Sequence, residues 1–441
     1  MQRFYNFIFV IENEYHSEDE ILSLLNYDDK WHAKLLSEKC INRNYLGQLS
    51  FSFVGIITVE DLLICILPKY FELDSLGFDD LIDATSKIIK VLKKASYIDR
   101  VTPDYDNFSF SSQNYFSELV LADNLIKDYL DNGIYIKEKV LLSVSQEGEV
   151  DWNKTINTFD PIFSKGYPIY TETLGYSTYI DDNFIISEVH KWLVKLYINK
   201  YGKLLTYNFT FSEDTIQDLT SLGAISYIKD VIYKELSQVY TDRQINILKI
   251  LIAGLNKSYD STIKGFSIYG TSYFHIIWEL ACSNVLNNKI GDFNQLIPKP
   301  VWNNLNEESK DKSSLKPDII SVIPSLEMLF IIDAKYYAIK YENNPGFNVI
   351  NNPGIADVGK QFLYEMAFSN LPYRKYNVFV FPSAQTTFIE VFGFVTFSLF
   401  LESKIWLVYI SPDHLFSSYL NNEIFDLSSL GLTIDKKLND N

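Results

Sequence analysis

The sequence has few cysteines, few histidines and no long apolar run. Its three cysteines, Cys40, Cys65 and Cys282, are far apart and odd in number, so they predict neither a disulfide framework nor a CxxC metal knuckle and indicate a reducing compartment. The five histidines show no HExxH or HxH spacing, and no GxSxG elbow is present, which leaves zinc-hydrolase and serine-hydrolase chemistry without support. The longest uncharged apolar run, Val391 to Leu401, is too short to span a bilayer. We therefore expect a soluble, cytoplasmic protein with no membrane partner.

The sequence also lacks an excess of positive charge. Lys and Arg number 39 and Asp and Glu number 56, which gives a formal net charge of −17 at pH 7. Because sequence-independent DNA affinity comes from cations that neutralise phosphates, this balance argues against a general nucleic-acid coat protein. It leaves room for a DNA enzyme with a local cationic surface. We expect such a chain to bind DNA weakly on its own at physiological salt.

No Gly/Ser-rich or Pro-rich linker, internal repeat or low-complexity segment divides the chain, so domain boundaries follow from changes in periodicity. The apolar N-terminus runs into Glu12 and Glu14 without a small-residue cleavage site, which predicts a strand and not a signal peptide. With 441 residues, 47% of them hydrophobic, the chain is long enough for two or three domains. We predict three: a β-rich domain over residues 1–110, a mostly helical one over 111–263, and an α/β domain over 264–441.

Local patterns in the first predicted domain indicate a hairpin followed by a helix. Residues 51–71 hold two β-branched runs that meet at a polar turn around Val59 to Asp61, which is a hairpin signal. Residues 79–95 carry apolar side chains at helical spacing, with Asp79 or Asp80 as the predicted N-cap.

The middle of the chain predicts mainly helices. Residues 115–133 are typical of an amphipathic helix that ends at Asn132-Gly133. Strands are expected from there to about Val150, followed by a loop that includes Trp152. Residues 185–255 then predict three or four helices.

The stretch from Leu315 to Tyr337, LKPDIISVIPSLEMLFIIDAKYY, carries the clearest chemical pattern. Two short apolar strands are joined by a turn at Pro324 to Leu326. Asp318 opens the first strand, and the second ends in Asp333-Ala-Lys335. A turn centred there places Asp318 across from Asp333, and because side chains alternate along a strand, Asp333 and Lys335 share a face. The sequence therefore predicts two carboxylates and an amine at one spot.

Such a convergence indicates metal-dependent phosphodiester chemistry. Carboxylates forced together repel unless a cation lies between them, and hard oxygen ligands with room for water are what Mg²⁺ prefers, with Mn²⁺ as a substitute. The metal can lower the pKa of a water, and Lys335 can orient that water or offset transition-state charge. The other interpretation is a solvent-exposed hairpin end, where Asp and Lys are common. The full pattern, Pro317-Asp318, then fourteen residues, then Asp333-x-Lys335 after an apolar strand, favours catalysis.

A helix predicted upstream carries a further acid. Residues 270–286 give a broad apolar surface, with Thr271 or Ser272 as the predicted cap. Glu279 is a lone carboxylate among these residues, and a buried carboxylate needs a partner or a metal. We interpret it as an outer-sphere or second-metal ligand; the alternative is a salt-bridged surface residue. His275, one turn earlier, is a weaker candidate for the same site.

Downstream, residues 353–368 predict a loop followed by a helix. We place Lys360 and Gln361 in its first turn, where free N–H groups favour a phosphate, and predict that both contact DNA or the active site. The alternative is an ordinary polar outer face. Residues 354–361, GIADVGKQ, almost spell a Walker A loop, but Gln361 stands where a Ser or Thr hydroxyl is needed. We therefore predict no nucleotide binding by this loop.

Four segments together resemble a known nuclease group. Residues 315–337 resemble the active-site core of PD-(D/E)xK nucleases. Phe53 to Lys69 resembles the N-terminal hairpin of McrC-like nuclease subunits, and Gly148 to Ile156 resembles a central motif of the LlaJI-type restriction family, which is McrC-like. Asp357 to Tyr364 resembles that family's helix after the nuclease core. The order and spacing of the four segments agree with the family.

The resemblance implies an α/β (α+β) protein: a C-terminal PD-(D/E)xK domain, with a mixed sheet flanked by helices, after a mixed β/α N-terminal region that contacts a partner. It implies Mg²⁺-dependent endonuclease activity on double-stranded DNA in a phage-defence restriction system. The implied partners are a McrB-like AAA+ GTPase ring, which a projection from the N-terminal half enters, and a companion DNA methyltransferase. Asp318, Asp333 and Lys335 match the core triad, and Glu279 matches the helix acid, which implies Asp318, Asp333 and Glu279 as metal ligands.

Two other functions stay open from the sequence. One is a stand-alone PD-(D/E)xK nuclease or repair enzyme without an NTPase, which would cut DNA by itself. The other is an adaptor whose hairpin only docks a partner and which would bind no divalent metal. The intact triad favours an enzyme over the adaptor.

Overall fold

The computed structural model describes residues 1–98, 117–144, 149–180, 184–260, 265–299, 301–303, 308–310, 316–342, 348–400 and 403–439. The predicted domain boundaries at 110/111 and 263/264, and the first residue of the central motif, Gly148, lie outside them. Within the described residues, none of the helices is long and apolar enough to cross a bilayer. The chain forms two compact units, Met1–Gln113 with Ile268–Asn441, and Asn114–Ser267. The three-domain division stays a prediction, and its first and third parts belong to one compact unit.

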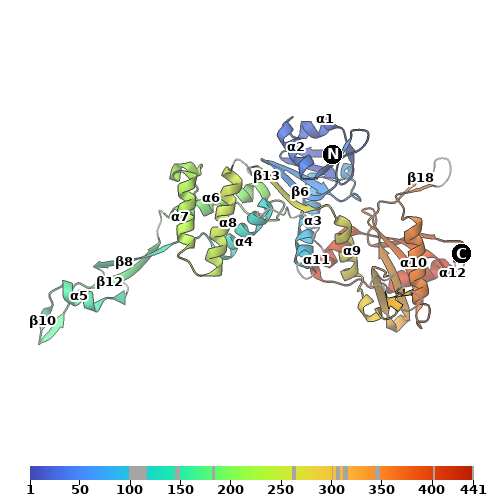
Figure 1. Ribbon diagram of the computed structural model, residues 1–441. Coiled ribbons are helices and arrows are strands. Elements are labelled where there is room, and N and C mark those ends of the chain that lie inside the picture. The colour runs from blue at the N-terminus through green and yellow to red at the C-terminus, as the bar shows by residue number, and fades with distance from the viewer. Residues whose placement is uncertain are drawn as a thin grey trace. The chain divides into compact units, whose positions relative to one another are not determined.

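The first unit contains an N-terminal sheet in the order β1-β2-β7-β6-β13, drawn from blue to yellow in Figure 1. β2 and β7 are parallel, and β6 and β7 form the hairpin predicted within residues 51–71, with Glu60 at its turn. A small sheet, β3-β5-β4, and three helices complete this part. The bounds are β1 Gln2–Phe4, β2 Phe7–Ile11, β3 Tyr15–His16, α1 Glu18–Leu24, α2 Asp29–Ser37, β4 Ile41–Arg43, β5 Leu49–Phe51, β6 Val54–Val59, β7 Leu62–Leu67, α3 Phe78–Ile98 and β13 Phe266–Thr271.

Helix α3 confirms the predicted helix over 79–95 but begins earlier than its predicted cap. Asp79 and Asp80 lie inside the first turn, because the helix starts at Phe78. The Asp80 carboxylate still serves the helix end, since it accepts a hydrogen bond from the backbone N–H of Gly77 (3.0 Å).

Two glycines allow β13 to lie against β6. A side chain on Gly55 would come 2.1 Å from the carbonyl oxygen of Tyr269, and one on Gly270 would come 2.1 Å from that of Val54. Both glycines have positive φ, 145° and 155°, which other residues rarely adopt. The chain therefore returns to the N-terminal sheet before it enters the C-terminal part of the unit.

The C-terminal sheet has the order β16-β17-β20-β22-β21 and is mixed, as the resemblance implied. β17, β20 and β22 are parallel, while β16 and β21 run antiparallel to their neighbours. All seven residues of β17 are buried, and helix α10 packs on β17, β20 and β22. The bounds are α9 Phe274–Val285, β14 Val301–Asn303, β15 Glu308–Lys310, β16 Ile319–Ile323, β17 Met328–Ala334, β18 Lys340–Glu342, β19 Asn348–Ile350, α10 Ile355–Ala367, β20 Arg374–Pro382, β21 Ile389–Val395, β22 Ile405–Ile410, α11 Pro412–Asn421 and α12 Ser428–Asn439.

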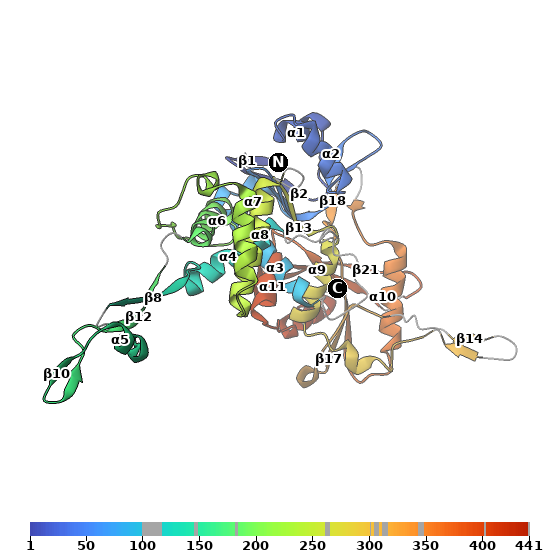
Figure 2. The ribbon, with the colours of Figure 1, turned by 60° about the vertical axis from the view of Figure 1, so that its left-hand side comes forward.

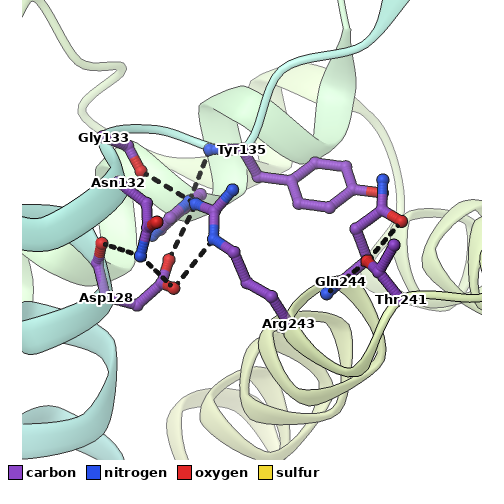
Figure 3. A network of polar contacts seen from close by, with 8 residues as sticks. Asp128, Asn132, Gly133, Tyr135, Thr241, Arg243 and Gln244 are labelled. Carbon is purple, nitrogen blue, oxygen red and sulfur yellow. Dashed lines mark hydrogen bonds and ion pairs between the residues drawn. The ribbon is translucent and has the colours of Figure 1, made fainter.

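The second unit is built on four helices, α4 (Glu118–Asn132), α6 (Ile185–Tyr201), α7 (Ile225–Leu236) and α8 (Asp242–Tyr259). They confirm the helix predicted over 115–133 and the helices predicted over 185–255. Figure 3 shows how the guanidinium of Arg243 on α8 joins the end of α4: it donates to both carboxylate oxygens of Asp128, each at 2.9 Å, and to the carbonyl of Gly133. Bidentate pairing of this kind fixes orientation as well as distance, so it holds α8 against α4.

An arm extends from these helices in both views of the ribbon (Figures 1 and 2). We define the arm as β8 (Glu138–Val144), β9 (Glu149–Val150), α5 (Trp152–Thr158), β10 (Ile162–Ser164), β11 (Tyr167–Ile169) and β12 (Leu174–Ile180). The loop predicted around Trp152 is wrong, because residues 152–158 are helical. Asp151 caps this helix: its side chain accepts from the Lys154 N–H (3.0 Å).

Candidate active site

The β16–β17 hairpin brings the two predicted aspartates together. Ile319 pairs with Ile332, so Asp318 and Asp333 are the next residues outward at the open end of the hairpin. The pairing predicted across the turn is thus confirmed. The carboxylate of Asp318 accepts a hydrogen bond from the backbone N–H of Ala334 (2.9 Å), and it lies in hydrogen-bond contact with the carboxyl of Asp333.

Lys335 completes the convergence. Its ammonium lies 2.6 Å from Oδ2 of Asp333 and 3.4 Å from Oδ1 of Asp357. Its backbone N–H donates to the carbonyl of Val380 on β20 (2.8 Å), which extends the strand pairing one residue beyond β17. Burial lowers the pKa of Lys335, but the charge and hydrogen bond of Asp333 and the charges of Asp357 and Asp318 together outweigh burial. The pKa is raised, so the ammonium stays protonated at neutral pH.

The acids of the site resist ionising together. Burial, and then the charge of Asp333, raise the pKa of Asp318 to about 8. Glu279 on α9 lies within electrostatic reach of the same group: burial, and then Asp333, raise the pKa of Glu279 to about 7, while Lys335 opposes the shift. Like charges held in a poorly solvated place shift in this direction, and a cation bound between them would reverse it.

These acids suit a hard cation, although they do not form a complete set of protein ligands around one point. In the described parts of the chain, no three His, Cys, Asp or Glu side chains already stand in metal-ligating positions. Mg²⁺ does not need them, because it keeps several waters and commonly takes one or two protein carboxylates. Asp318 and Asp333 offer those two, at the open end of the β16–β17 hairpin. Glu279 is close enough to feel their charge.

Helix α9 presents Glu279 but starts later than predicted. It begins at Phe274, and Thr271 ends β13 instead of capping the helix, accepting a hydrogen bond from the N–H of Tyr273 (3.0 Å). The predicted Thr271 or Ser272 cap is therefore wrong. His275 is exposed on this helix, and its pKa is lowered by burial and then by the charge of Lys69, so its charged neighbour is Lys69 and not the aspartates.

Helix α10 places Lys360 and Gln361 in its second turn, since it begins at Ile355; their predicted place in the first turn is wrong. Lys360 is exposed. Gln361 is fully buried, and its amide N–H groups donate to the carbonyls of Ile331 (3.0 Å) and Val378 (3.2 Å). A buried side chain offers no surface to DNA, so the predicted direct contact of Gln361 is not supported by this placement. Gln361 instead ties α10 to the two central strands.

The near-Walker segment has the wrong backbone for a phosphate loop. Residues 355–361 are helical, with Gly354 at the N-cap. In a Walker A motif these residues would instead form an open loop around the phosphates. That this segment binds no nucleotide stays a prediction.

Two residues of α10 face the site, and they are the first and last residues of the segment that resembles the family's helix, although neither was assigned a role from the sequence. Asp357 pairs with Lys335. Tyr364 is buried, and burial, then Asp333 and Asp318, raise the pKa of its hydroxyl to about 12. Asp357 and Tyr364 are seven residues apart, two helical turns, so they share a face. The resemblance of Asp357 to Tyr364 to the family's helix, together with this spacing, was the available signal.

Asn288 supports Asp318 from a loop. Its side-chain amide donates to the carbonyl of Asp318 (2.9 Å), and its side-chain oxygen accepts from the N–H of Ile320 (3.1 Å). This pair of bonds imitates a neighbouring strand at the free edge of β16. Nothing in the sequence distinguishes Asn288 from the many other asparagines, so it was not predictable.

Two comparisons with known proteins match most of the chain. The family model described as LlaJI restriction endonuclease matches residues 53–413. The Type II restriction enzyme BsuMI component YdjA of Bacillus subtilis (strain 168) is 32% identical over 433 residues, which cover 96% of this chain and 91% of that protein.

Two solved assemblies show a weaker likeness. In a half-complex from a tetradecameric assembly of Thermococcus gammatolerans McrB AAA+ hexamers with bound McrC, one chain is 13% identical with a TM-score of 0.37, covering 94% of this chain and 99% of its own length. In a T. gammatolerans McrBC complex the values are 10%, 0.28, 62% and 84%. At these scores the likeness carries no weight for function. The family match and the B. subtilis relative show the family: this chain belongs to the LlaJI restriction endonuclease family.

Proposed function

We propose that this chain is the DNA-cutting subunit of its restriction system, a Mg²⁺-dependent endodeoxyribonuclease of the PD-(D/E)xK type. The observation that carries the proposal is the meeting of Asp318, Asp333 and Lys335 at the end of one hairpin. The family supplies the substrate class, since its members are restriction endonucleases. The geometry supplies the chemistry, because two carboxylates and an ammonium at one point are what phosphodiester hydrolysis needs.

Asp318 and Asp333 would hold the cation, with Glu279 as an outer-sphere or second-metal ligand. When bound, Mg²⁺, or Mn²⁺ in its place, would supply positive charge and Lewis acidity beside the scissile phosphate. Asp318 is held for this task by Asn288 and by the N–H of Ala334. Its raised pKa means that the proton it carries near neutral pH would leave when the cation arrives.

Lys335 would act on the attacking water or on the charge that develops at phosphorus. Its ammonium is already oriented by Asp333 and Asp357, so little reorganisation is needed when the phosphate enters. The exposed Lys360 on α10 remains a proposed contact to the DNA backbone.

The arm is the proposed contact to a second component, a McrB-like AAA+ GTPase ring. Its exposed side chains include an unusual number of large apolar ones: Val140, Leu141, Val144, Trp152, Ile156, Ile162, Phe163, Tyr167 and Ile169. Apolar surface of this extent marks a place where another protein binds. A companion DNA methyltransferase would protect the host's own sites, and the B. subtilis relative is likewise named as one component of a restriction enzyme.

Plasmid cleavage by the full chain, with its AAA+ partner, GTP and Mg²⁺, tests the proposal. The wild-type protein should cut, and Asp333→Ala should not, although its circular dichroism spectrum and partner binding stay unchanged. Cleavage by Asp333→Ala at the wild-type rate would end the assignment. Cleavage by the wild-type chain without any NTPase would instead support a stand-alone nuclease.

A further inference from the structure

A lysine from the N-terminal hairpin lies beside the strand end that carries the candidate site. Lys69 follows β7 by two residues. Its ammonium lies 4.3 Å from the ring centroid of Tyr336 and 5.7 Å from that of Tyr337. These two tyrosines come directly after Lys335. A cation from a segment far away in the sequence therefore lies against the two residues that follow the proposed catalytic lysine.

This position is fixed by a buried hydrogen-bonded group. The hydroxyl of Tyr336 donates to the carboxylate of Glu12 (2.5 Å) and accepts from the backbone N–H of Lys69 (3.2 Å). Glu12 is itself held through its N–H, which donates to the carbonyl of Leu67 (2.8 Å). Tyr336 and Glu12 are each only 7% exposed. The backbone of Lys69 is thereby pinned, while its side chain runs out along the tyrosine rings.

The ammonium of Lys69 is available to bind an anion. In the described portions of the chain Lys69 forms no ion pair, and Glu12, the carboxylate whose charge acts on it, already accepts a hydrogen bond from the Tyr336 hydroxyl. The side chain is half-buried, and burial lowers the pKa of Lys69 although Glu12 opposes this. A partly desolvated cation against aromatic faces is the kind of group that gains from an incoming anion.

Helix α9 shows on which side of the site the cation lies. The ring of Phe274, the first residue of α9, lies 5.4 Å from the ring of Tyr336, so Lys69 sits at this end of the helix. The charge of Lys69 acts on His275, and Glu279, four residues on, lies about one turn away on the same face, about 6 Å along the axis. The charge of Lys69 therefore acts at the start of α9, about one turn before the proposed metal ligand Glu279.

We propose that Lys69 binds a phosphate of the DNA backbone that neighbours the scissile phosphate, so that the N-terminal hairpin supplies part of the substrate site. The inference rests on the proposed nuclease function and extends it. A purely structural role, in which Lys69 only packs on Tyr336, is the alternative that the test must separate.

The dependence of DNA affinity on salt concentration distinguishes a phosphate contact by Lys69 from a purely structural role. A fluorescein-labelled 30-base-pair duplex is titrated with the full chain in Ca²⁺ between 25 and 200 mM KCl, and binding is read by anisotropy. Each lost phosphate contact lowers the slope of log K against log salt by about 0.9. Lys69→Gln should lose about one such unit, and Lys69→Arg should keep the wild-type slope. Lys34→Gln is the matched control, since that ammonium pairs with Glu38 on α2.

A second measurement needs no variant. Amine acetylation of the wild-type protein, mapped by mass spectrometry, should drop several-fold at Lys69 when the duplex is added and stay constant at Lys34. A wild-type slope in Lys69→Gln, or equal acetylation with and without DNA, overturns the inference. The proposed function would survive that result if Asp333→Ala still abolished cleavage. A wild-type chain that binds no duplex even at the lowest salt counts against both.

Discussion

Asp318 and Asp333 face each other across the open end of the β16–β17 hairpin, and the N–H of Ala334 holds the carboxylate of Asp318 in place (2.9 Å). The pair sits at the end of a strand whose seven residues are all buried, so neither aspartate can move apart to relieve the repulsion without disturbing the core. Lys335 lies 2.6 Å from Asp333, whereas burial and the charge of Asp333 raise the pKa of Asp318 to about 8 despite its hydrogen bond from Ala334. A cation bound between the two carboxylates would therefore relieve their repulsion.

Replacing Lys335 should separate catalysis from binding. Lys335→Gln removes the ammonium that lies 2.6 Å from Asp333 but keeps a polar side chain of similar length. We expect kcat to fall by about 10²–10³-fold, on the order of 2.7–4 kcal/mol, as for loss of one preorganised donor to developing charge. Affinity for DNA in Ca²⁺ should change little. Lys360→Gln, an exposed neighbour on α10, is the control and should weaken DNA binding with little effect on kcat; the reverse pattern would contradict the assignment.

The raised pKa of Asp318 makes the metal-free protein sensitive to pH. An acid whose pKa is higher in the folded chain than in the unfolded chain binds more protons when folded, so the stability it contributes is present at low pH and is lost as pH rises. For Asp318 the window runs from its ordinary value near 3.8 up to about 8. With EDTA, Tm should fall as pH rises through this window.

Mg²⁺ should reverse that trend, because it binds the deprotonated acids. The rise in Tm on adding Mg²⁺ should be larger at pH 8 than at pH 6, and Asp318→Asn should reduce both the pH trend and the Mg²⁺ effect. Thermal melts followed by circular dichroism measure both. A Mg²⁺ effect that is the same at pH 6 and pH 8 would argue that these acids do not hold the cation.

The site was predictable where it depends on local pattern. The alternation of residues in β17 and the short turn at Pro324 to Leu326 sufficed to pair Asp318 with Asp333, because strand geometry is a property of neighbouring residues. The surroundings of Lys335 were not predictable in the same way. Asp357 contacts Lys335 from α10. Lys69, which contacts Tyr336, lies 267 positions earlier in the chain, after the β6–β7 hairpin.

Gln361 shows a different error, in which a contact with DNA was predicted from a short motif. A Lys-Gln pair beside a glycine suggested a phosphate-binding helix end. In the structure the side chain of Gln361 instead packs on the sheet and donates to its backbone carbonyls. Only tertiary structure reveals which helix face is covered, since one residue of rotation exchanges surface for core.

Gln361→Leu should therefore destabilise the protein and leave DNA affinity unaffected. The change removes two buried hydrogen bonds, to Ile331 and Val378, and should cost about 1–3 kcal/mol in the free energy of unfolding. Urea titration measures the loss. Lys360→Gln, one residue away and exposed, should be neutral in the same experiment. A stable Gln361→Leu protein with weakened DNA binding would restore the original prediction of a DNA contact.

The arm offers the clearest test of the partner. Phe163 on β10 is 70% exposed, so nothing in the unit's own core depends on it. If the arm binds a partner, such a side chain becomes buried on association, and Phe163→Ser should weaken binding of the AAA+ subunit by about 2 kcal/mol, roughly 30-fold in Kd. Binding is measured by size-exclusion chromatography and interferometry with GTP or a slowly hydrolysed analogue.

The matched control is Tyr240→Ser, which removes an aromatic ring that is 90% exposed in the same unit but outside the arm. Both variants should melt at the wild-type temperature, because each lost ring is solvated in the free protein. Equal losses of partner affinity in the two variants would point to a general effect of surface aromatics and not to the arm. Loss in Phe163→Ser alone, with cleavage reduced in proportion, would tie assembly through the arm to the activity of a hairpin that lies in the other compact unit.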